Sequence, residues 1–242
     1  MSATDATQLG RAKPTRHYGW SAFATGCARF WRAALIFGVV AAVNAAIQAL
    51  LTIPKPVPGL DNGQFLLLAL ASYLVLLVSL AVITTAALRT VTGRAGFADT
   101  WKTIKPRLGH FLLWTFGWTL ACTIGLMLYA LPGILLLLLT PYVVIAAADG
   151  IGNPLTANFR AIGSRFGRYL ITVAVSCVWL VALYVTSGMT SFILDGANAA
   201  FVFWLIAGVI GAWMITTWAL IYRSTPVGSM AETADPSNRP EA

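Results

Sequence analysis

Long apolar stretches separated by short polar segments dominate the sequence. Five of these stretches contain no Asp, Glu, Lys or Arg; they are residues 33–53, 65–88, 111–131, 169–194 and 199–222. A helix needs roughly 20 apolar residues to cross the hydrocarbon core of a bilayer. The pattern therefore predicts five membrane-spanning helices.

A sixth apolar stretch, residues 133–148, is shorter, and Pro141 interrupts it. At 1.5 Å per residue it would cover about 24 Å, less than the usual hydrocarbon thickness. If it did not cross, however, the basic loop with Arg160, Arg165 and Arg168 would lie on the side opposite to the other basic loops. We therefore predict a sixth span, kinked at Pro141.

Basic residues fall on one side of this six-span arrangement. Fifteen of the 16 Lys and Arg residues precede the first span, lie between spans two and three or four and five, or follow the last span, and Lys55 alone lies opposite. Such an asymmetry marks the cytoplasmic side. Both termini are expected there, with polar, disordered tails at residues 1–18 and 226–242 around a membrane domain of residues 19–225.

The composition agrees with a membrane protein and argues against several other classes. The chain is 58% hydrophobic and only 10% charged, too few charges for a water-soluble surface. The net charge of +8 does not indicate nucleic-acid binding, because most basic residues lie within a few positions of a span. Three separated cysteines and two histidines predict no metal site or cofactor, and the absence of a paired acid and base predicts no enzyme.

An internal repeat relates residues 97–112 to residues 155–170. With a shift of 58, Ile104, Arg107, Gly109 and Leu112 fall on identical residues. A third, fainter copy, with a shift of 78, precedes the first span and places Arg29 on Arg107. The fold class expected is an all-α membrane bundle of six transmembrane helices, built from three parallel repeats of an interfacial helix plus a helical hairpin.

The repeated element has the pattern of an amphipathic helix. Apolar residues recur at i, i+4, i+7 and i+11 in both copies: Phe97, Trp101, Ile104 and Leu108, and Leu155, Phe159, Ile162 and Phe166. Flanking basic residues suit a helix that lies in the membrane interface, and Asn153-Pro154 provides an N-cap and a first-turn proline for the second copy. A plain cytoplasmic loop is the alternative.

The segment from Pro141 to Leu170 resembles a recurring segment of YciC-type bacterial membrane proteins and of the membrane domain attached to some glycerophosphoryl diester phosphodiesterases. In that pattern a span ends in an acidic residue and glycine, and a helix then leads to a basic, aromatic entry into the next span. Asp149, Gly150, Pro154, Phe159 and Arg165 hold those places. The resemblance implies a multi-pass protein of the bacterial inner membrane. It does not imply phosphodiesterase activity, which belongs to a separate soluble domain.

Three polar residues within or at the end of spans are candidates for function. Asn44 and Gln48 share a helix face at mid-span and would either line a substrate path or join one helix to another. Asp149 would hold a coupling ion or proton, pair with Arg165 or Arg168, or stabilise the following helix start.

The leading hypothesis is a non-enzymatic protein that organises or binds anionic lipids, or a membrane-protein partner, through its basic interfacial helices. The candidate site consists of Trp101, Lys102, Arg107, Phe159, Arg160, Arg165 and Arg168. A transporter or permease subunit, with a cavity at Asn44 and Gln48, is the alternative.

Overall fold

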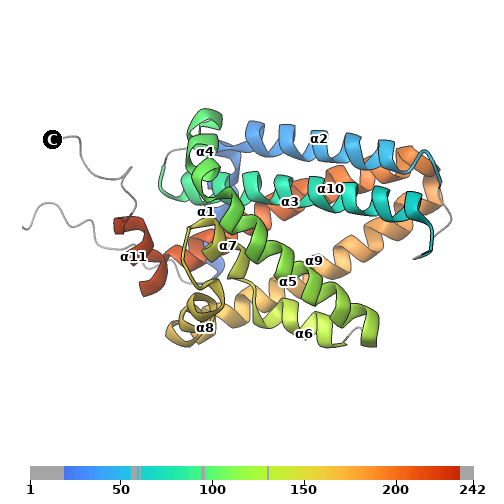
Figure 1. The fold of residues 1–242 in the computed structure, drawn as a ribbon. Helices are drawn as coiled ribbons and strands as arrows, with labels where there is room; N and C mark the ends of the chain where they lie inside the picture. The colour runs from blue at the N-terminus through green and yellow to red at the C-terminus, as the bar shows by residue number, and fades with distance from the viewer. Residues whose placement is uncertain (1–18, 56–58, 60, 94–95, 130, 235–242) are drawn as a thin grey trace, which may run out of the picture.

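The computed structural model describes residues 19–55, 59, 61–93, 96–129 and 131–234, and within these residues the chain is helical, without strands (Figure 1). The helices are α1 Gly19–Arg32, α2 Ala34–Leu51, α3 Gly63–Val91, α4 Phe97–Ile104, the 3₁₀ turn η1 Lys105–Arg107, α5 Leu108–Tyr129, α6 Leu131–Leu139, α7 Val143–Ala148, α8 Pro154–Ser164, α9 Phe166–Ile193, α10 Gly196–Arg223 and α11 Pro226–Ala234.

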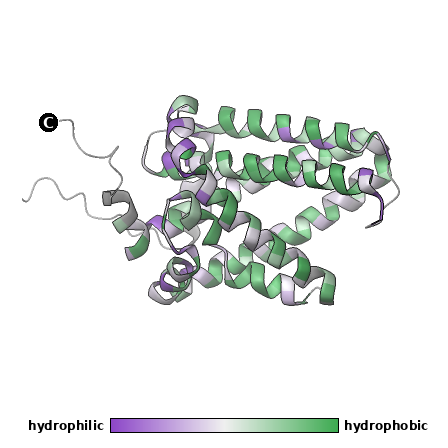
Figure 2. Ribbon diagram, viewed as in Figure 1, coloured by the Kyte–Doolittle hydropathy of each residue, from purple (hydrophilic) through white to green (hydrophobic). Residues whose placement is uncertain are grey.

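Four helices of the described chain are long and apolar enough to cross a membrane: α2, α3, α9 and α10. They correspond to the first, second, fifth and sixth predicted spans. Apolar residues cover the lengths of these helices, and hydrophilic residues gather at the end of the bundle where α4 and α8 lie, here called the basic end (Figure 2). The ends of α2, α5 and α9 and the starts of α3, α6 and α10 lie at the opposite end.

Many large apolar side chains of these helices point outward, and alanines line much of the interior beside a few large residues such as Phe37 and Leu77. Leu35, Val39 and Val43 of α2 are exposed, whereas Ala41 and Ala45 are buried. This inverts the usual protein surface and suits lipid, which solvates leucine and valine while small residues let helices approach closely. Such a close approach joins α2 to α10.

Gly208 of α10 makes that approach feasible. A Cβ at Gly208 would lie 2.8 Å from the Cβ of Ala41, too close for any side chain.

The third and fourth predicted spans fold as α5 and as two shorter helices, α6 and α7. The chain breaks between them at Thr140–Tyr142, so Pro141 interrupts the helix as predicted. Asn158 of α8, fully buried, bridges this break: its Oδ1 accepts from the backbone N–H of Tyr142 at 3.0 Å, and its Nδ2 donates to the carbonyl of Leu139 at 3.0 Å. One side chain thus satisfies backbone groups that a continuous helix would have paired.

Helices form at the positions where interfacial helices are predicted. The segments 97–108 and 155–166 contain α4 with η1 and α8, and both lie at the basic end (Figure 1). The Asn153 side chain accepts from the backbone N–H of Thr156 at 3.1 Å, which confirms the predicted N-cap.

The C-terminal segment differs from the prediction. Disorder was expected from residue 226, but Pro226–Ala234 form α11, which packs on α10 and α8. Arg223 Nη1 donates to the carbonyl of Gly228 at 2.8 Å and holds the turn between α10 and α11. Residues 1–18 and 235–242, the remainder of the predicted tails, lie outside the described residues.

We expect Asn158→Ala to destabilise the protein by about 2–5 kcal/mol, because it removes two hydrogen bonds and leaves buried backbone groups at the Pro141 break without partners. Thermal unfolding in mild detergent measures the effect. Thr156→Ala, an exposed position on the same helix, is the control and should leave the midpoint nearly unchanged. Equal midpoints for the two variants would contradict the role of Asn158.

Candidate membrane-interface site

Asp149, at the end of α7, forms a buried ion pair with Arg223, at the end of α10. Asp149 Oδ1 lies 2.6 Å from Arg223 Nη2, and the two side chains are 5% and 10% exposed. Arg165 and Arg168 are the partners that the sequence suggests for Asp149, whereas the structure pairs it with Arg223. The two residues are 74 positions apart in the sequence, and their ion pair joins the end of α7 to the end of α10.

Arg107 of η1 approaches the same turn from the other side. Its Nη1 donates to the backbone carbonyl of Asp149 at 3.0 Å. Gly150 follows with a φ of +79°, and a Cβ there would meet the Arg107 side chain at 3.0 Å. Glycine is therefore required at residue 150 both for the backbone conformation and for the space that Arg107 occupies.

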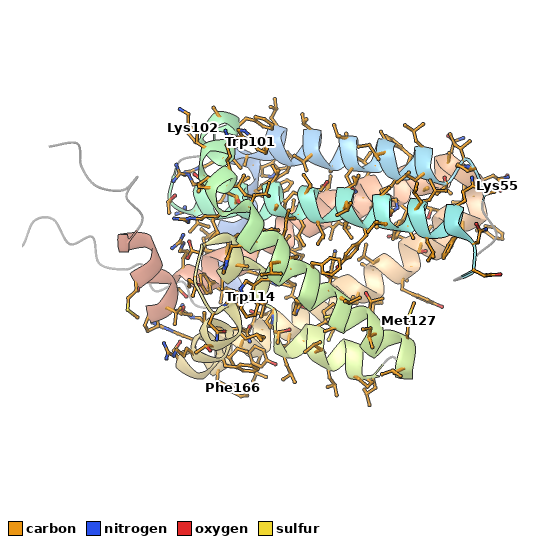
Figure 3. All side chains as sticks on the ribbon, in the orientation of Figure 1. Lys55, Trp101, Lys102, Trp114, Met127 and Phe166 are labelled. Atoms are coloured by element: carbon orange, nitrogen blue, oxygen red, sulfur yellow. The ribbon has the colours of Figure 1, made fainter. Side chains whose placement is uncertain are left out.

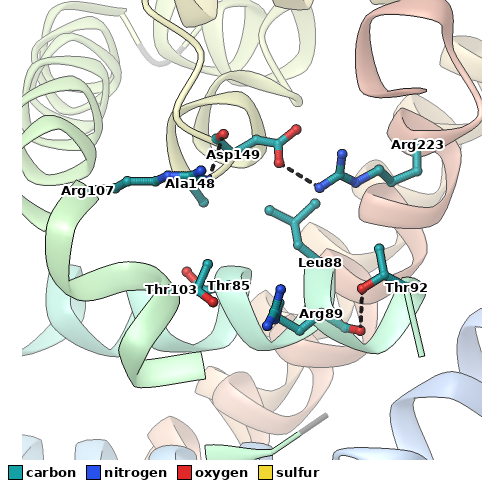
Figure 4. A pocket seen from close by; sticks show the side chains of 9 residues that line it. All are labelled: Thr85, Leu88, Arg89, Thr92, Thr103, Arg107, Ala148, Asp149 and Arg223. Carbon is teal, nitrogen blue, oxygen red and sulfur yellow. Dashed lines mark hydrogen bonds and ion pairs between the residues drawn. The ribbon is translucent and has the colours of Figure 1, made fainter. Parts of the chain in front are cut away.

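Arg89, Arg107 and Arg223 line one small pocket together with Asp149, and Arg223 is the arginine drawn bonded to the Asp149 carboxylate (Figure 4). Arg89, at the end of α3, lines the same small pocket as Arg107 and Arg223. The pocket has a volume of about 20 Å³, enough for about one water molecule and too small for an organic ligand. This arrangement favours a structural role for Asp149, namely to hold the ends of α3, η1, α7 and α10 together.

The exposed part of the basic end carries basic and aromatic side chains side by side. On α4, Lys102 is exposed and Trp101 is 48% exposed, and Lys105 follows in η1, also exposed. Trp101 and Lys102 lie at the end of the molecule opposite to Lys55 (Figure 3). The other half of α4 is internal, since Thr100 and Ile104 are each only 1% exposed.

Helix α8 repeats this division. Phe159 is 55% exposed and Phe166, just after the helix, is 58% exposed, next to exposed Arg160 and Arg165. The buried face instead carries small or polar residues: Ala157, Asn158 and Ala161. The predicted apolar stripe thus faces outward in large part, where a membrane interface would lie.

Two predicted site residues are engaged within the protein. Arg107 is bound to the Asp149 turn as described, and Arg168 Nη1 donates to Ser224 Oγ. Arg107 and Arg168 therefore form hydrogen bonds within the protein. The other predicted site residues lie on the exterior of the basic end: Trp101, Lys102, Phe159, Arg160 and Arg165.

The polar pair at mid-span lies between α2 and α3. Gln48 Nε2 donates to the carbonyl of Ser72 at 3.0 Å, and Ser72 Oγ donates to Gln48 Oε1 at 2.6 Å. Ser79 Oγ donates to Asn44 Oδ1 at 3.5 Å. Asn44 and Gln48 are buried, at 4% and 3% exposed, and these bonds join the two helices.

Sequence reasoning missed two residues that organise the site. By sequence, Arg223 is one more basic residue after the last span, and Asn158 is one polar residue within the amphipathic segment 155–166. A buried partner for Asn158 could have been anticipated from Pro141, since a proline break leaves backbone groups that need bonds. Nothing in the sequence indicated that Arg223 would reach Asp149.

Comparisons of the chain with protein-family models, with curated proteins and with solved structures found no match. The resemblance to YciC-type proteins stays a prediction.

We expect Asp149→Asn to destabilise the protein by about 3–5 kcal/mol, because Arg223 would remain buried without its counter-charge. The double variant Asp149→Leu/Arg223→Leu should recover much of this loss, since it removes both charges together. Unfolding midpoints in detergent measure both effects.

Asp195→Asn, an exposed carboxylate before α10 whose side chain caps no backbone N–H, is the control and should change the midpoint little. A double variant no more stable than Asp149→Asn would contradict the ion-pair argument.

Proposed function

We propose that the protein is a non-enzymatic multi-pass protein of the bacterial inner membrane that binds anionic lipid headgroups. The binding surface is the basic collar, defined as Lys102, Lys105, Arg160 and Arg165 together with the aromatic residues Trp101, Phe159 and Phe166. In this proposal the basic end faces the cytoplasm, as the distribution of Lys and Arg predicts.

The observation that carries this proposal is the pairing of exposed cations with exposed aromatic rings on two separate helices at one end. Aromatic side chains are frequent at the headgroup level of a membrane, where the ring contacts hydrocarbon and neighbouring polar side chains contact headgroups and water. Each Lys or Arg close to an anionic surface contributes about 1 kcal/mol. Four exposed cations at the same level thus favour an anionic leaflet substantially over a zwitterionic one.

The proposal includes six spans arranged as three units, α1–α3, α4–α7 and α8–α10. Helix α5 has 22 residues, about 33 Å long, which suffices to cross the hydrocarbon. The end of α5 and the start of α6 lie at the same end of the molecule as the ends of α2 and α9 (Figure 1). Helices α6 and α7 would cross together, with Asn158 satisfying the backbone between them.

A recurring contact supports the three units. Each unit begins with a short helix at the basic end, α1, α4 or α8. An arginine in or shortly after that helix donates a hydrogen bond to the last residues of the helical hairpin that follows. Arg29 donates to the carbonyls of Thr90 and Val91, Arg107 to the carbonyl of Asp149, and Arg168 to Ser224 Oγ. Arg29 and Arg107 are equivalent positions of the sequence repeat, and both bind carbonyls where a helix ends, where a cation is favourable.

Transport through the face of Asn44 and Gln48 has less support, because both side chains are hydrogen-bonded to α3. These hydrogen bonds between α2 and α3 are a sufficient reason for Asn44 and Gln48 to occur in the middle of an apolar helix.

We expect replacement of the four cations (Lys102→Gln, Lys105→Gln, Arg160→Gln, Arg165→Gln) to reduce affinity for phosphatidylglycerol at least tenfold, from the loss of about 1 kcal/mol per charge. Titration of the purified full chain in detergent with the lipid, followed by native mass spectrometry, measures bound lipid against a phosphatidylcholine reference.

Lys55→Gln is the matched control, because it removes one cation from the opposite end; it should leave phosphatidylglycerol binding unchanged. Binding that survives in the fourfold variant, or no preference for phosphatidylglycerol over phosphatidylcholine in the unmodified chain, would contradict the proposal.

A further inference from the structure

An open cleft lies where α9 ends and α10 begins, at the end of the molecule that carries Lys55 (Figure 1, Figure 3). It has a volume of about 380 Å³ and shares no residue with the basic collar. Polar and aromatic side chains line it together, among them Ser187, Thr190, Ser191, Asp195, Phe203 and Trp204.

The carboxylate of Asp195 borders this cleft. Asp195 is exposed, does not cap α10, and forms neither an ion pair nor a hydrogen bond with the residues that the structure describes. An exposed carboxylate is ordinarily satisfied by water, so the groups beside it decide whether the cleft suits a ligand.

The hydroxyl groups next to Asp195 offer acceptors. Ser191 Oγ donates its hydrogen to the carbonyl of Ser187 at 2.7 Å, and Thr190 Oγ1 donates to the carbonyl of Thr186 at 2.8 Å. A hydroxyl has a single hydrogen, so only the lone pairs of these oxygens remain for another molecule. The C-terminal end of α9 adds negative partial charge. This side of the cleft therefore suits a cation that carries N–H donors.

Aromatic rings of α10 line the same cleft. Phe203 and Trp204 are partly exposed, and their ring centroids lie 5.5 Å apart in a T-shaped arrangement. The faces of such rings attract cations, tryptophan most strongly.

The first residue of α10, Gly196, also lines the cleft, so the positive end of this helix lies beside Asp195. A zwitterion, in which an anionic group accompanies the cation, therefore suits the cleft better than a bare cation.

The level of the cleft along the helices indicates the source of such a group. Helices α9 and α10 are long and apolar enough to cross a membrane, and the cleft lies where they meet, opposite to the basic end. If they cross, the cleft is at the headgroup level of the leaflet that the basic collar does not contact.

We propose that this cleft binds the phosphoethanolamine headgroup of a phospholipid, with its primary ammonium at Asp195 and Ser191. This goes beyond the lipid binding proposed for the basic collar, because it concerns another surface, the other leaflet and another headgroup. A trimethylammonium group has no N–H donor and would leave the acceptors unused. The cleft should therefore prefer phosphatidylethanolamine to phosphatidylcholine.

Titration of the purified full chain in detergent with phosphatidylethanolamine, followed by native mass spectrometry, tests this. We expect a preference of about tenfold over phosphatidylcholine. Asp195→Asn should weaken phosphatidylethanolamine binding about tenfold, because it removes the charge from the bond to the ammonium. Asp195→Glu keeps the charge and should retain most of the affinity.

Asp61→Asn is the matched control, because Asp61 is an exposed carboxylate before the start of α3, at the same end but outside the cleft. It should leave the affinity unchanged. Ser191→Ala removes one acceptor and should weaken binding about threefold, whereas Ser191→Thr keeps the hydroxyl and should bind normally.

Three results would overturn the proposal: no preference for phosphatidylethanolamine over phosphatidylcholine, undiminished binding by Asp195→Asn, or an equal loss in Asp61→Asn. Soluble O-phosphoethanolamine that binds as tightly as the lipid would overturn a phospholipid as the source. The fourfold collar variant should bind phosphatidylethanolamine normally and Asp195→Asn should bind phosphatidylglycerol normally, so failure of this proposal and failure of the proposed function are distinguishable.

Discussion

Hydrocarbon offers no hydrogen-bond partners, and this constraint accounts for the polar contacts between the apolar helices. Where Pro141 breaks the helix, Asn158 supplies both an acceptor and a donor to the backbone. Where Gln48 enters the apolar region, Ser72 satisfies it through side chain and backbone. Asn158, Gln48 and Ser72 thus complete bonds that water would complete elsewhere.

In the described part of the long helices, charged residues lie near the helix ends, and one pair of them is buried there. Asp149 and Arg223 pair at 2.6 Å with almost no exposure, and Arg107 binds the same turn. The remaining cations of α4 and α8 point outward beside aromatic rings. The basic end therefore has two layers: an inner one that fixes the helix ends against one another, and an outer one that is available to a lipid surface.

The sequence predicted the elements well, because they follow from local pattern. Apolar length defined α2, α3, α9 and α10, the stripe around Trp101 and Phe159 indicated α4 and α8, and Pro141 marked a break. It could not predict contacts between distant segments, such as Arg223 with Asp149. The α11 helix was missed because Pro226–Ala234 lack clear apolar periodicity, and its contacts with α10 and α8 are between distant or differently predicted segments.

The central claim, that apolar helices cross the bilayer in pairs with the basic residues on one leaflet, is tested most directly by cysteine accessibility. In a variant without Cys27, Cys122 and Cys177, single cysteines introduced by Asn62→Cys, Pro132→Cys and Thr156→Cys would be labelled in oriented membranes with an impermeant thiol reagent. The account predicts labelling of the first two from one side and of the third only from the other. Labelling at residue 132 from the same side as residue 156 would contradict it.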